Sequence, residues 1–108
     1  MSTLSTHVLD TGTGRPASGV RVALERTDGA SLGADTTDAD GRVGTLGPDG
    51  LAPGDYRLRF ATGAYFAASA SEGFYPEVVI TFTVTDASQH YHVPLLLSPF
   101  GYSTYRGS

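Results

Sequence analysis

Apolar and polar residues alternate one by one along most of this 108-residue chain, and no other feature restricts its fold as strongly. A clear example is VVITFTV at residues 78–84. A period of two puts successive side chains on opposite faces of a β-strand, whereas a helix repeats every 3.6 residues. The alternation predicts strands over 3–10, 19–28, 56–60, 78–86, 90–98 and 101–105.

The segments between these strands are rich in turn-forming residues. The chain has 14 glycines and six prolines, which gather in stretches such as TGTGRPASG and GPDGLAPGD. Residues 62–71 differ, because they are rich in alanine and contain no β-branched run, so they form the one predicted helix. Short strands separated by turns indicate an all-β fold, here a two-sheet antiparallel β-sandwich with one short helix.

Length and charge exclude several classes of protein. A chain of 108 residues is expected to form a single domain, over residues 1–108, with one modest core. The net charge of −4 argues against a nucleic-acid partner, since phosphate binding needs a basic surface. No cysteine, signal peptide or membrane-length apolar stretch is present, so we expect a cytoplasmic protein without a membrane association.

Two of the predicted strands have an outer face of unusual composition. In the strand at 90–98, the row opposite the core consists of His90, His92, Pro94 and Leu96. In the N-terminal strand the corresponding row is Ser5, His7 and Leu9. Solvated faces normally carry charged or hydroxyl side chains, so these rows predict contact with another subunit. Because proline cannot donate to a ladder, Pro94 is expected near a sheet edge or at a bulge.

The only three histidines of the chain lie on these two strands. Each one alone is more often a hydrogen-bonding surface or interface residue than a catalytic group. His90 and His92, two positions apart on one face, have the spacing of two metal ligands, but no third ligand is evident, so we expect no metal. Imidazole titrates near neutral pH, so the functional interpretation is general acid–base catalysis.

Arg42 follows a turn of sequence DADG. Taken alone, it is an ordinary solvated turn residue. Asp38 and Asp40 resemble part of a calcium-binding loop, but the remaining ligands and the closing glutamate are missing, so the turn interpretation is preferred. The chain also lacks the G-x-S-x-G motif of serine hydrolases and any glycine-rich phosphate loop.

Three segments together resemble one family. They are STHVLDTGTGRPASGV near the start, HYHVPLLLSPFGYS near the end and the terminal YRGS, with DGR and FYPEV between them. This combination is similar to the transthyretin-related 5-hydroxyisourate hydrolases over nearly the whole chain. Transthyretin itself has the fold and the LLSP segment but lacks the histidine pair and the YRGS ending.

The resemblance implies an eight-stranded sandwich that assembles as a homotetramer, a dimer of dimers around a central channel. It also implies hydrolysis of 5-hydroxyisourate to 2-oxo-4-hydroxy-4-carboxy-5-ureidoimidazoline, without a cofactor. The catalytic residues that it implies are His7, Arg42, His92 and Ser108. The substrate-binding residues that it implies are His7, Arg42, Tyr105, Arg106 and Gly107.

The chemistry of these residues suits ring opening by water. A neutral imidazole, of His92 or His7, would activate the water, and Arg42 would stabilise the developing negative charge. The SPFG turn is expected to pair the last strand with residues 90–98 and to bring residues 105–108 towards His92. The alternatives are a transthyretin-like carrier of a small ligand and a structural adhesion module.

Overall fold

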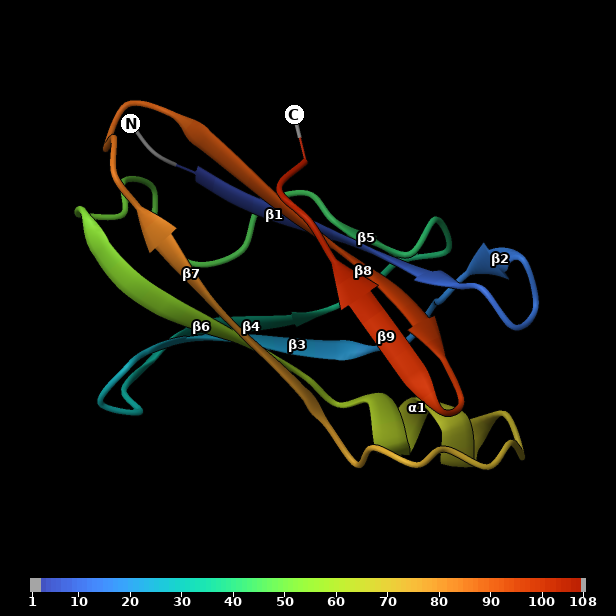
Figure 1. Ribbon diagram of the computed structural model, residues 1–108. Coiled ribbons are helices and arrows are strands. Elements are labelled where there is room, and N and C mark those ends of the chain that lie inside the picture. Colours follow the sequence, from blue (N-terminus) through green and yellow to red (C-terminus); the bar gives the residue numbers. More distant parts are fainter. Residues whose placement is uncertain (1–2, 108) are drawn as a thin grey trace.

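The computed structural model describes residues 3–107, which form nine strands and one helix (Figure 1). The strands are β1 (Thr3–Asp10), β2 (Arg15–Pro16), β3 (Arg21–Arg26), β4 (Ser31–Thr36), β5 (Arg42–Val43), β6 (Gly54–Phe60), β7 (Val78–Val84), β8 (His90–Ser98) and β9 (Gly101–Thr104). The helix, α1, spans Thr62–Ala68. All six predicted strands are present, and two of the additional strands have only two residues each.

The strands form the two sheets that the sequence predicts. One sheet has the order β2-β1-β8-β9, with β5 paired to the N-terminal strand β1, and the other has the order β4-β3-β6-β7. The alternation holds in each long strand. In β6, for example, Tyr56, Leu58 and Phe60 are buried between the sheets, whereas Arg57 and Arg59 are not. The buried rows of side chains from the two sheets face each other and form the hydrophobic core.

The expectation of an antiparallel sandwich is wrong for one pair of strands. β1 runs parallel to β8, with Thr3 opposite His90 and Asp10 opposite Leu97, and the other ladders within residues 3–107 are antiparallel. Parallel neighbours need a long crossover connection, which here contains the whole second sheet and the helix. Alternation has the same period in both orientations, so it does not distinguish them.

The turn before Arg42 holds β5 against β1. Oδ1 of Asp38 accepts hydrogen bonds from the backbone N–H groups of Asp40 and Arg42, so this carboxylate is engaged in the turn. Gly41 has a φ of +74°, and its carbonyl accepts a hydrogen bond from the N–H of Val8 at 2.7 Å. A Cβ on Gly41 would overlap the carbonyl oxygen of Val8, so only glycine allows this approach.

Helix α1 is shorter than predicted, since it ends at Ala68 and not at residue 71. Ala70 adopts a left-handed φ of 54°, and the N–H of Ser71 donates to the carbonyl of Phe66. This closing turn ends the helix at Ala68, although the alanine content of residues 62–71 favours continuation. Within residues 3–107 no helix is long and apolar enough to cross a membrane.

The last strand pairs as predicted. β9 runs antiparallel to β8 across a tight turn, from Ser98 opposite Gly101 to Leu95 opposite Thr104. The same register returns at an isolated bridge between His92 and Gly107, where the N–H of Gly107 donates to the carbonyl of His92 at 2.9 Å. The C-terminal residues therefore come back to His92.

Pro94 explains the gap in this ladder. It was expected at a sheet edge or bulge, but β8 is an interior strand between β1 and β9. Pro94 lies next to Leu95, where the ladder with β9 stops, and as a proline it has no N–H with which to extend that ladder. The hydroxyl of Thr104 donates instead to the carbonyl of Pro94 at 2.7 Å. The proline is tolerated because β9 ends beside it.

Candidate active site

The parallel ladder between β1 and β8 assembles the predicted site residues on one face. In its register Ser5 lies opposite His92 and His7 lies opposite Pro94, while β5 places Arg42 opposite His7. Residues paired in this way project to the same side of a sheet. Because the alternate residues Leu4, Thr6 and Val8 are buried in the core, this cluster lies on the outer face of the sheet.

A pocket opens on this outer face. It has a volume of about 300 Å³, at the small end of the range for ligand sites. Its lining consists of Ser5, Thr6, Arg42, Val43, Gly44 and His92. Arg42 and His92 therefore share one concave surface, which we call the outer pocket. His7 lies beside this pocket, because it follows Thr6 in the chain and pairs with Arg42 across the β1–β5 ladder.

Ser5 holds the imidazole of His92 by its Nδ1 atom. The distance from Oγ of Ser5 to Nδ1 of His92 is 2.7 Å, and the same Oγ lies 2.8 Å from Nε2 of His90. Burial lowers the pKa of His92, and the nearby His7, Arg42 and His90 lower it further because they disfavour a second positive charge. The neutral ring is therefore the favoured form, as a general base requires.

Gly107 lies directly against the His92 ring. A Cβ added to Gly107 would overlap Cδ2 of His92 and would lie 3.1 Å from its Cγ. Every other residue has a Cβ, so only glycine permits the backbone bridge and this ring position together. The resemblance implied that Gly107 binds substrate, and the contact observed here is with His92.

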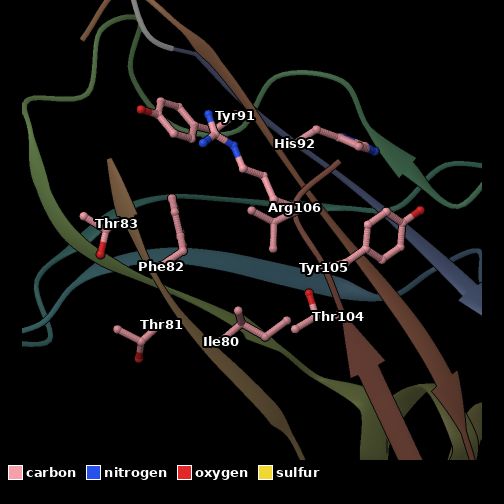
Figure 2. A pocket seen from close by; sticks show the side chains of 10 residues that line it. Ile80, Thr81, Phe82, Thr83, Tyr91, His92, Thr104, Tyr105 and Arg106 are labelled. Carbon is pink, nitrogen blue, oxygen red and sulfur yellow. The ribbon is translucent and has the colours of Figure 1, made fainter. Parts of the chain in front are cut away.

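The two residues before Gly107 point to different sides of the sheet. Tyr105 shares the outer face with His92 and is 57% exposed. Arg106 lies on the inner side, where its guanidinium stacks over the ring of Tyr91, 4.8 Å from the ring centroid, and donates to the side chain of Gln89. Figure 2 shows Arg106 beside Tyr91 and Tyr105 directed away from both.

Arg106 borders a second hollow, shown in Figure 2, of about 320 Å³ at the open edge between the two sheets. Its lining is mostly from β7 on one side and from β8 and the C-terminal segment on the other. His92 contributes to this lining as well as to the outer pocket. His92 is therefore the residue that the two linings share.

The predicted residues are thus brought together in part. His7, Arg42, His92, Tyr105 and Gly107 gather on or beside the outer face. Arg106 lies on the other side, so its predicted contact with substrate stays a prediction, and Ser108 lies outside the described residues. In that same part of the chain, no group of three potential metal ligands converges.

Ser5 is the residue that sequence reasoning missed. It was counted only as a member of the outer row of the N-terminal strand. Its contact with both His90 and His92 depends on the register of two strands that are distant in the sequence. The only sequence signal was the shared pattern of the two outer rows, which gives neither the pairing nor the register.

We predict that Arg42→Gln raises the pKa of His92, because it removes a positive charge that disfavours the imidazolium. An NMR titration of the ring protons measures this pKa directly. Arg57→Gln is a matched control, since Arg57 lies on β6 of the other sheet. If the two variants titrate His92 alike, Arg42 does not act on this ring.

Comparison with known proteins identifies the family of this chain. The model of the HIUase/Transthyretin family matches residues 4–107. The 5-hydroxyisourate hydrolase of Caulobacter vibrioides is 50% identical over 115 residues, which cover 100% of each chain. The structure of Klebsiella pneumoniae 5-hydroxyisourate hydrolase superposes with a TM-score of 0.91 at 45% identity, covering 98% of this chain and 99% of that one.

Transthyretin has the same fold but a more distant sequence. Sea bream transthyretin, solved in complex with thyroxine, has a TM-score of 0.87 and 30% identity, covering 96% of this chain and 93% of that one. These findings confirm the resemblance inferred from the sequence and the two-sheet fold that it implied. This chain belongs to the HIUase/Transthyretin family.

Proposed function

We propose that this protein hydrolyses 5-hydroxyisourate to 2-oxo-4-hydroxy-4-carboxy-5-ureidoimidazoline, as part of urate degradation. The observation that carries the proposal is the identity of half the residues, over the full length, with a protein named 5-hydroxyisourate hydrolase. The outer pocket supports it independently, since a neutral imidazole and a guanidinium share this small concavity.

The proposed general base is His92. Its lowered pKa keeps the imidazole neutral at physiological pH. The imidazole can then take a proton from a water molecule that attacks a carbonyl carbon in the ring of the substrate. The C–N bond then breaks, and the imidazolium returns a proton to the leaving nitrogen. His7, the neighbouring imidazole on β1, is proposed to orient the water or to share this proton transfer.

Arg42 is proposed to bind the substrate and to stabilise the oxyanion that forms when water adds. Its guanidinium is a planar donor of fixed charge, suited to adjacent oxygens of a small planar ring. One well-placed electrostatic donor of this kind is worth roughly 10²–10³ in rate. Tyr105, Arg106, Gly107 and Ser108 complete the proposed site. Of these, Arg106 would have to leave Tyr91 to reach a ligand in the outer pocket.

A carrier function is the second candidate, and the fold of sea bream transthyretin, solved with thyroxine, favours it. The greater identity with named hydrolases and the presence of His92 beside Arg42 favour the enzyme. Turnover separates the two candidates, because a carrier binds its ligand without consuming it.

The protein is expected to accelerate the decay of 5-hydroxyisourate, followed by absorbance against the spontaneous decay. His92→Asn should remove most of the catalysed rate, about 10²-fold or more, because asparagine cannot accept a proton from water. His90→Asn, two positions away, is the comparison variant and should have a much smaller effect than His92→Asn, because His90 is exposed and does not line the outer pocket. Equal losses in both variants would contradict the assignment of His92.

Gly107→Ala should lower kcat by about 10²-fold while the fold persists. The added methyl would overlap the His92 ring, so either this ring or the backbone at residue 107 would be displaced. The same assay measures kcat. Gly101→Ala is the control, since a Cβ there meets only Oγ of Ser98, at 3.6 Å. Similar activities for the two variants would show that the contact between Gly107 and His92 does not matter for catalysis.

We also propose that the protein is a homotetramer, a dimer of dimers joined in part by this outer face. Beside the histidines the face presents Leu9 opposite Leu96, both only half-buried in the single chain. Light scattering at micromolar concentration is expected to give four times the mass of one chain. A monomer that retains full activity would rule out a shared site at this face.

A further inference from the structure

A continuous row of hydrogen-bonding groups runs along the outer face from β1 to β8. Oγ1 of Thr3 contacts Nδ1 of His90, Nε2 of His90 lies 2.8 Å from Oγ of Ser5, and this Oγ lies 2.7 Å from Nδ1 of His92. The row begins at Thr3 and the exposed His90 and ends at the half-buried His92 in the outer pocket. Thr3 and His90 lie outside the lining of that pocket, whereas Ser5 and His92 are part of it.

The hydroxyl of Ser5 has one hydrogen but contacts two imidazole nitrogens. It can donate to only one of them, so the other nitrogen must carry a hydrogen and donate to Oγ. The tautomers of His90 and His92 are therefore coupled through Ser5. Such coupling needs both contacts to be hydrogen bonds, and both distances are in the normal range.

When both rings are neutral, two arrangements satisfy this constraint. In the first, Nδ1–H of His92 donates to Ser5, the Ser5 hydroxyl donates to Nε2 of His90, and Nδ1–H of His90 donates to Thr3. In the second, every donor and acceptor is reversed, and the hydrogen of His92 is on Nε2. Only the first arrangement leaves a lone pair on Nε2 of His92 to accept a proton from water.

We propose that Ser5 is a positioning residue that keeps the hydrogen of His92 on Nδ1, by directing its own hydrogen to His90. The inference rests on the proposed role of His92 as general base. Arg42, on β5, shares the outer pocket with His92, and a positive charge in that pocket favours a bare nitrogen on the His92 ring there over an N–H. Ser5 thus makes the ring a base, and Thr3 and His90 stabilise that choice.

The first test is the tautomer of His92 in the unmodified protein. The ¹⁵N shifts of the two ring nitrogens, measured at a pH where the ring is neutral, distinguish N–H from bare nitrogen. The expected result is a protonated Nδ1 and an unprotonated Nε2. The opposite tautomer would overturn the proposal, and this measurement does not depend on any activity of the protein.

The second test compares three variants in the 5-hydroxyisourate assay. Ser5→Ala should lower kcat at least about 10-fold, with a much smaller change in KM, because the ring remains but loses its fixed tautomer. Ser5→Thr, which keeps the hydroxyl, should restore most of kcat. Ser103→Ala, on the same face but on β9, is the control and should act like the unmodified protein.

These results separate failure of the inference from failure of the proposed function. An unmodified protein that does not accelerate the decay of 5-hydroxyisourate would reject the function, while the ¹⁵N shifts would still report the tautomer. Full kcat for Ser5→Ala in an active enzyme would reject the role of Ser5. Equal losses for Ser5→Ala and Ser5→Thr would also reject it, because they would show that packing matters and the hydroxyl does not.

Discussion

The parallel ladder between β1 and β8 is the constraint on which the arrangement of the rest depends. It places Ser5 beside His92 and fixes the outer row from which the site is built. β5 and β9 are then added on either side of this pair, the first with Arg42 and the second with the C-terminal segment. A shift of one residue would turn the histidines into the core and the apolar row outwards, so burial of the core holds the register.

The surroundings of His92 illustrate how one face can hold two opposite electrostatic requirements. A base must be neutral, and an oxyanion needs a nearby positive charge. In the proposed mechanism Arg42 would meet both requirements, since its charge lowers the pKa of His92 and would be available to a developing anion. Burial of the ring lowers its pKa in the same direction, and in the arrangement proposed above Nδ1 of His92 donates to Oγ of Ser5, which leaves Nε2 as the proton acceptor.

Much of this structure was predictable from local patterns, and the failures have a common cause. Alternation correctly gave six of the nine strands and their faces, and the SPFG turn gave the pairing of β9 and the return of Gly107 to His92. The parallel orientation, the interior position of Pro94 and the bonds of Ser5 were not predicted, because each depends on which distant strands become neighbours. The end of α1 was misjudged because alanine content does not reveal a left-handed turn at Ala70.

The pairing of the first strand with the eighth also has a consequence for synthesis. The paired residues are 87 positions apart, as for Thr6 and Val93, so at about 5–20 residues per second β1 waits several seconds for its partner to be made. Contacts between residues that are this far apart in the sequence also slow folding itself. A nascent or truncated chain can contain both His7 and Arg42 and still lack His92, which β8 places beside them. Activity should therefore begin only after β8 has been synthesised and has paired with β1.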